Sequence, residues 1–197
     1  KPPSKVKIPK SPRKYYLNSF KKEYMDLVSI LKIVVNRLDA LTIPYLLTGG
    51  LAVSFWGLPR TTHDIDIVIE AKKEDKKKIV DIFKKDFYVS KEAVDLAIDQ
   101  RSTFNIIHFK SGLKVDFWLA KKDAHKDSEF KRRLNKKIFG KKIYIITPED
   151  LILEKMLWHK GGGSSRHLED IKGIIQISKP DLTYIKNWAE KQLTNEI

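Results

Sequence analysis

Cysteine is absent from this 197-residue sequence, which excludes a disulfide framework and a metal site built on thiolates. No apolar run approaches the length that crosses a bilayer, and the N-terminus lacks the apolar core of a signal peptide. We therefore expect a cytoplasmic protein without a membrane partner. With 42% hydrophobic residues, a chain of this length can build one sizeable core.

Acidic residues are missing from residues 1–22, which contain eight Lys or Arg and so supply +8 of the net charge of +14. Four prolines interrupt this segment, and it shows no hydrophobic periodicity. We expect residues 1–22 to form a basic, partly disordered N-terminal tail. Two interpretations are open: a solvated leader, or an electrostatic arm that binds the phosphates of RNA or DNA.

Residues 23–146 alternate between helical and strand patterns, which predicts the core of the protein. Apolar residues at helical spacing predict helices over residues 23–40 and 73–84, and residues 50–56 fit a short helix. Short apolar runs predict strands over residues 43–48, 65–69, 104–109, 113–119 and 143–146.

The last part of the chain, residues 147–197, predicts a helical segment. Thr147 is a typical N-cap, Pro148 suits the first helical position, and acids follow in the first turn. We expect this helix to end near Trp158, a glycine-rich break over residues 161–165, and two further helices over residues 167–177 and 182–193. The chain is therefore predicted to be α+β, with a mixed sheet flanked by helices and a C-terminal helical segment.

Two aspartates, Asp64 and Asp66, interrupt an otherwise apolar strand. Side chains alternate along a strand, so the two carboxylates share one face while the neighbouring isoleucines take the other. Asp116 interrupts a later apolar strand in the same way, and it joins them if the two strands pair. Three such carboxylates could hold two magnesium or manganese ions, which is the chemistry of a phosphoryl-transfer site.

The pair Gly49-Gly50 ends one predicted strand and opens the next helix. Glycines let the backbone approach a phosphate closely, and a helix N-terminus presents free N–H groups with a positive dipole. An ordinary tight turn would use the same residues, so the pair indicates a phosphate site only in combination with the aspartates that follow it.

The run from Leu47-Thr-Gly49-Gly50 through Arg60-Thr-Thr-His-Asp64-Ile-Asp66 resembles the signature of the DNA polymerase β-like nucleotidyltransferase superfamily. That signature is a Gly-Gly or Gly-Ser pair, a spacer, Asp-x-Asp, and a third Asp on a later strand. The Gly57-Leu-Pro-Arg-Thr-Thr segment and the helical tail look closest to the abortive-infection (type IV toxin) nucleotidyltransferase-like branch. The motifs span residues 45–178.

The resemblance implies a metal-dependent nucleotidyltransferase with the polymerase β-like fold. It implies that a nucleoside monophosphate moves from an NTP, such as ATP, to an acceptor hydroxyl while pyrophosphate leaves. Asp64, Asp66 and Asp116 would bind Mg²⁺ or Mn²⁺ and carry catalysis. Gly49 and Gly50 would bind the nucleotide. Arg60 and Lys155 are further nucleotide-binding candidates, although a loop arginine and a solvated helix lysine explain them equally well.

Several functions remain open within this framework. A tRNA end or other RNA fits the positive charge as acceptor, and a protein acceptor is an alternative. A cationic antibiotic is disfavoured, because the basic surface would repel it. The chain could instead be a catalytically silent module that binds nucleic acid or a partner. As the toxin-like half of a toxin–antitoxin pair, it would bind a cognate antitoxin-like protein.

Overall fold

The computed structural model describes residues 12–194, 196 and 197, and its centre is a mixed seven-stranded sheet. The strand order is β3-β4-β5-β2-β1-β7-β6. The strands are β1 (Tyr45–Thr48), β2 (Asp64–Ile69), β3 (Phe87–Val89), β4 (Thr103–His108), β5 (Lys114–Leu119), β6 (Leu134–Ile138) and β7 (Lys141–Ile145). β2 runs antiparallel to β1 and parallel to β5, so the two strands that carry the aspartates are direct neighbours.

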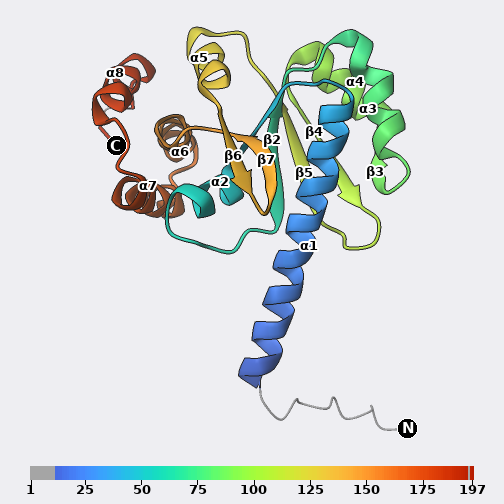
Figure 1. Cartoon of the computed structure of the whole chain (residues 1–197). Helices are drawn as coiled ribbons and strands as arrows, with labels where there is room; N and C mark the ends of the chain where they lie inside the picture. Colours follow the sequence, from blue (N-terminus) through green and yellow to red (C-terminus); the bar gives the residue numbers. More distant parts are fainter. Residues whose placement is uncertain (1–11, 195) are drawn as a thin grey trace, which may run out of the picture.

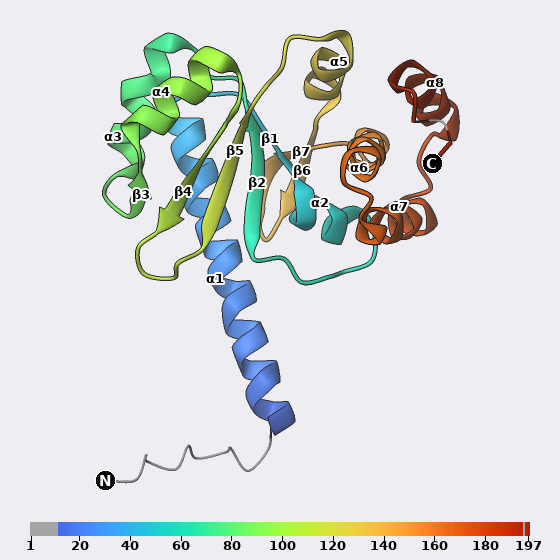
Figure 2. The same cartoon turned by 180° about the vertical axis from the view of Figure 1, so that it is seen from behind.

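Helices surround this sheet on both sides and at both ends (Figures 1 and 2). They are α1 (Pro12–Ala40), α2 (Gly49–Trp56), η1 (Lys73–Asp75), α3 (Lys76–Phe83), α4 (Lys91–Gln100), α5 (Ala124–Arg132), α6 (Pro148–Gly162), α7 (Ser165–Ser178) and α8 (Leu182–Gln192). α3 and α4 lie at the β3–β4 end, whereas α6, α7 and α8 gather at the other side of the molecule. The predicted α+β class with a mixed sheet is confirmed.

Part of the core lies between one face of the sheet and α1. Alternation in β2 and β5 buries Ile65, Ile67, Val115 and Phe117 completely, and it leaves the aspartate face half-buried. The part of α1 that spans residues 27–38 contributes a buried apolar stripe to the same core. The face of the sheet that carries the carboxylates is therefore held rigidly from behind by close packing.

The N-terminal helix is longer than the pattern predicted. α1 begins at Pro12, so residues 12–22 are helical where a partly disordered tail was expected. Proline is favoured at a first helical position, and Lys, Arg and Leu have high helix propensity without needing apolar periodicity. Residues 1–11 lie outside the described residues. The division of the chain into a tail, a core and a C-terminal segment, with boundaries after residues 22 and 146, stays a prediction.

The C-terminal helices follow the predicted signals closely. Thr147 caps α6, because its side-chain oxygen accepts a hydrogen bond from the backbone N–H of Asp150 at 3.1 Å. α6 ends at Gly162 rather than Trp158, and Gly163 with φ of +68° closes it in the left-handed conformation that glycine favours. The predicted break is therefore shorter than expected. No helix within residues 12–194 is long and apolar enough to cross a membrane.

Candidate active site

The three aspartates predicted from the sequence come together in the structure. Asp66 of β2 and Asp116 of β5 are direct partners in the parallel pair, and Asp64 precedes Asp66 by two residues on the same face. All three side chains line one open cleft with a volume of about 1120 Å³. The clustering follows from strand alternation and from the pairing of β2 with β5.

Asp66 is the electrostatic centre of this group. Burial raises the pKa of its carboxyl above the ordinary value, and the neighbouring charges of Asp64 and Asp116 raise it further. A hydrogen bond with the side chain of Trp118 and the positive charge of Lys155 act in the opposite direction. A carboxylate held beside two others favours a bound cation, and three sets of oxygen ligands suit a hard divalent ion.

Neighbouring side chains orient the other two carboxylates. The hydroxyl of Thr62 donates to Oδ1 of Asp64 at 2.7 Å. Lys114 lies two residues before Asp116 on the same strand face, and its ammonium is 2.7 Å from the Asp116 carboxylate. The hydrogen bond with Asp116 raises the pKa of Lys114, so the lysine stays charged and offsets part of the negative charge. The role of Thr62 was not apparent in the sequence, because a threonine two residues before an aspartate is not distinctive by itself.

Gly49 is required by the close approach of the α2 N-terminus to Asp66. Its φ is +64°, and a β-carbon at this position would lie 1.8 Å from Oδ2 of Asp66. At Gly50, a β-carbon would lie 2.5 Å from Oγ1 of Thr62. The two glycines thus allow backbone N–H groups at the start of a helix to face the carboxylate cluster.

Lys155 of α6 lies in the same cleft, and its side chain is held by Asp170 of α7. The ammonium of Lys155 is 3.0 Å from Oδ2 of Asp170. Arg60 binds the same carboxylate through two hydrogen bonds, of 2.7 and 3.1 Å. Lys155 lines the cleft, whereas Arg60 does not belong to its lining. Arg60 therefore holds the carboxylate that orients Lys155, and its own contact with nucleotide stays a prediction.

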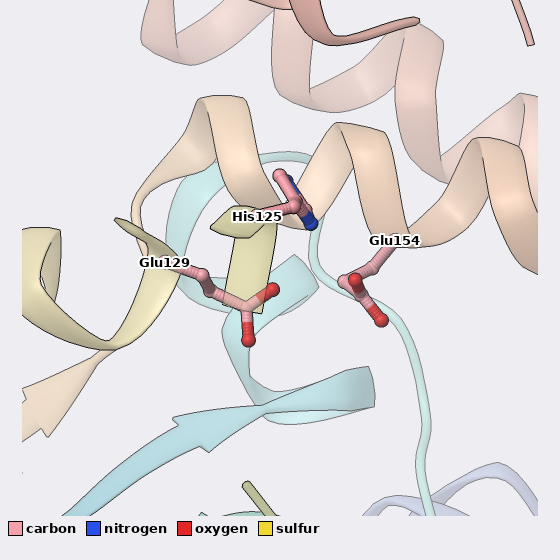
Figure 3. Close-up of side chains that lie close together, drawn as sticks. All are labelled: His125, Glu129 and Glu154. Carbon is pink, nitrogen blue, oxygen red and sulfur yellow. The ribbon is translucent and has the colours of Figure 1, made fainter. Parts of the chain in front are cut away.

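A second side of the cleft comes from α5 and α6, and sequence reasoning missed it. Lys126 and Glu129 of α5 and Glu154 of α6 all contribute to the lining. Figure 3 shows the carboxylates of Glu129 and Glu154 converging with the ring of His125. Trp118 of β5 and Trp158 of α6 meet in an edge-to-face contact with ring centroids 5.4 Å apart, and both line the cleft. No sequence motif marks the glutamates and Lys126, whereas Trp118 shares the strand face of Asp116 and could be expected in the site.

Comparison with known proteins agrees with this geometry. The family model of the aminoglycoside-2''-adenylyltransferases matches residues 30–172. A search of curated proteins found no match.

Solved structures with a similar fold share little sequence with this chain. ANT(2'')-Ia in complex with adenylyl-2''-tobramycin has a TM-score of 0.52 at 12% identity, over 87% of this chain and 99% of that one. An antigenic nucleotidyltransferase-like protein from Paracoccidioides brasiliensis has a TM-score of 0.51 at 22% identity, over 79% of this chain and 75% of that one.

These findings confirm the predicted superfamily, whereas the placement nearest the abortive-infection branch stays a prediction. Because the family model covers most of the chain, including both strands that carry the aspartates, the protein belongs to the aminoglycoside-2''-adenylyltransferase family and is a polymerase β-like nucleotidyltransferase.

Proposed function

We propose that the protein transfers a nucleoside monophosphate from an NTP to an acceptor hydroxyl in a reaction that depends on a divalent metal ion. The observation that carries this proposal is the convergence of Asp64, Asp66 and Asp116 beside the glycine-opened N-terminus of α2. The family description favours ATP as the donor. Asp64, Asp66 and Asp116 are the proposed metal ligands and catalytic residues.

Each group of residues in the cleft has a separate proposed role in the reaction. The three carboxylates would hold Mg²⁺ or Mn²⁺, which when bound neutralises charge on the α-phosphate and on the departing pyrophosphate. Asp116 accepts the proton of the attacking hydroxyl. The backbone at Gly49 and Gly50 approaches the phosphates, and Lys155, held by Asp170, contacts the triphosphate. Such transfer depends mainly on positioning and charge neutralisation.

The acceptor that we propose first is RNA, including a tRNA end. The net charge of +14 attracts a polyanion. Arg101 and Lys121 line the cleft and are candidates for contacts with RNA phosphates. A protein hydroxyl remains an alternative. The family match favours a second candidate, an aminoglycoside antibiotic, in contrast to the expectation from surface charge. A toxin-like role and an antitoxin-like partner gain no support from this match and stay predictions.

The decisive experiment is transfer of label from each α-labelled NTP, with magnesium or manganese, to total RNA, to protein and to aminoglycosides. Asp64→Asn and Asp66→Asn should each reduce transfer on the order of a hundredfold or more, as removal of a single electrostatic group does in other enzymes. Asp81→Asn, at an exposed carboxylate outside the cleft, serves as the matched control. If the wild type transfers nothing to any acceptor, the catalytically silent binding module replaces the enzyme.

A further inference from the structure

One face of the paired strands β2 and β5 carries four charged side chains at adjacent positions. The register pairs Asp64 with Lys114 and Asp66 with Asp116, and residues two apart on a strand point to the same side. Three carboxylates and one ammonium group therefore share this face, on two strands that lie about 4.8 Å apart. The pairing of the strands itself fixes Lys114 beside the proposed metal ligands.

The ammonium of Lys114 contacts a carboxylate oxygen that a metal ion would need. It lies 2.7 Å from Oδ2 of Asp116, whose side chain is 19% exposed. The hydrogen bond with Asp116 raises the pKa of Lys114, and the charges of Asp116, Asp64 and Asp66 act in the same direction. Lys114 therefore stays charged near pH 7, and one positive charge is already present in the carboxylate site.

The contact between Lys114 and Asp116 is reversible, because the side chain of Lys114 is only partly enclosed. It is 44% exposed, and its neighbour on β4 is Ile107, which is exposed as well. An ion pair at this exposure is weak, so a stronger ligand of either partner can break it. Lys155 differs in this respect, since its side chain is 10% exposed and its ammonium is held by Asp170.

We propose that Lys114 is an internal counter-ion of the carboxylate site, which competes with a divalent ion for Asp116 until a triphosphate binds. This inference rests on the proposed function and adds an order of binding to it. In that function Asp116 is both an ion ligand and the acceptor of the hydroxyl proton, and its pairing with Lys114 hinders both roles. The negative charge of an arriving triphosphate offers the ammonium another partner, so Asp116 is released when the donor is present.

Calorimetric titration of manganese into the nucleotide-free, full-length protein tests this competition without turnover. Lys114→Met should bind manganese about tenfold more tightly than the wild type, because both the competing hydrogen bond and the repulsion between the ammonium and the ion are lost. Lys114→Arg keeps the charge and the donor groups, so its affinity should stay within about threefold of the wild type. Lys114→Gln, which also removes the charge, should show the same gain and serves if the methionine variant fails to fold.

Titration of a triphosphate in the absence of metal tests the second half of the inference. The probe is α,β-methylene-ATP, which cannot transfer its nucleotide, and EDTA removes divalent ions. Lys114→Met should bind this analogue about fivefold more weakly than the wild type, because the triphosphate loses a charged partner. A merely structural role for Lys114 would not strengthen the binding of one ligand and weaken that of the other.

Lys121→Met is the matched control for manganese, because Lys121 lines the same cleft and its loss removes the same charge. Its effect on manganese affinity should be less than about threefold, since solvent screens an exposed charge.

Three results would each overturn the inference: no gain in manganese affinity in Lys114→Met, the same gain in Lys121→Met, or an analogue that fails to bind the wild type or binds Lys114→Met equally well. Manganese binding that requires Asp66 but is indifferent to Lys114 would leave the proposed function standing and remove only this inference. Absence of nucleotide transfer, combined with the affinities expected here, would do the reverse.

Discussion

Gly49 faces the carboxylate of Asp66 so closely that no side chain fits between them: a β-carbon on Gly49 would fall 1.8 Å from Oδ2 of Asp66. The start of α2 and the centre of β2 are thereby fixed against each other. Any residue other than glycine must move either the helix N-terminus or the carboxylate. The glycine and the aspartate consequently act as one unit of the site.

Gly49→Ala should lower both stability and nucleotide transfer. The φ of +64° and the contact with Asp66 should together cost about 1–3 kcal/mol of the free energy of unfolding. A chemical denaturation curve measures this change. Gly161→Ala is the control for stability, because Gly161 lies within α6 and a β-carbon there meets nothing within 4 Å. Equal midpoints for Gly49→Ala and the wild type would contradict the close approach.

Manganese binding should depend on Asp66. Calorimetric titration should show binding to the wild type and its loss in Asp66→Ala, because three oxygen ligands around one point suit a hard divalent ion better than two. Asp95→Ala removes a carboxylate from the exposed ion pair with Lys91 on α4 and should leave the titration unchanged. Undiminished binding in Asp66→Ala would show that the ion is held elsewhere.

Without metal, Asp66→Asn should melt at a higher temperature than the wild type near pH 7. The pKa of Asp66 is raised in the folded protein, so the folded state binds more protons than the unfolded state between the two pKa values, and stability falls as pH rises through that window. Below the unfolded pKa both states are protonated, and the advantage of the asparagine should vanish. Melting curves from pH 3 to pH 8 would show it, and a pH-independent difference would contradict the assignment.

Arg60→Ala should destabilise the fold and weaken nucleotide binding indirectly. It removes both hydrogen bonds from the buried carboxylate of Asp170 and leaves Lys155 as the remaining charged partner. We expect a loss of about 2–4 kcal/mol in the free energy of unfolding. Lys91→Ala breaks an exposed pair that solvent screens, so it should leave the free energy of unfolding nearly unchanged. A rise in KM for the NTP that Arg60→Lys restores in part would assign Arg60 a positioning role.

Deletion of residues 1–11 removes four lysines and tests the proposed electrostatic arm. If these lysines contact phosphates, RNA affinity should fall, and the slope of log K against log salt should become shallower by about one unit per lost contact. Filter binding at several salt concentrations measures the slope. Calorimetric NTP affinity, which depends on the cleft, should stay the same. An unchanged slope would identify the segment as a solvated leader.

The sequence predicted those parts of the molecule whose position in the fold follows from a short stretch of neighbouring residues. The alternation around Asp64, Asp66 and Asp116 identified the carboxylate face, and Thr147 and Pro148 marked the start of α6. The short strands β3 and β6 were missed. β3 has only three residues, and β6 is a lysine-rich edge strand, so neither shows a clear alternation of apolar and polar residues. α4 was missed although Ser90 caps it and Val94, Ala97 and Ile98 recur at helical spacing.

Helix α5 illustrates what a single sequence cannot show. Its buried positions are His125, Glu129 and Phe130, so the face that packs inward is mostly polar and looks like a solvated helix. Burial of Glu129 is tolerated because the ammonium of Lys126 pairs with it. The same ammonium pairs with Glu154, which belongs to α6 and is distant in the sequence. For the same reason the sequence left Arg60 open between a nucleotide contact and a loop arginine, because its partner Asp170 lies 110 residues away.

The contact between Trp118 and Trp158 gives the molecule an intrinsic optical reporter. One indole belongs to the sheet and also hydrogen-bonds with Asp66, and the other belongs to α6 and is half exposed to solvent in the cleft. Any ion or nucleotide that alters Asp66 changes the electric field at Trp118, and any movement of α6 changes the edge-to-face contact between the two rings. Tryptophan emission should therefore register occupancy of the cleft in real time, without a label.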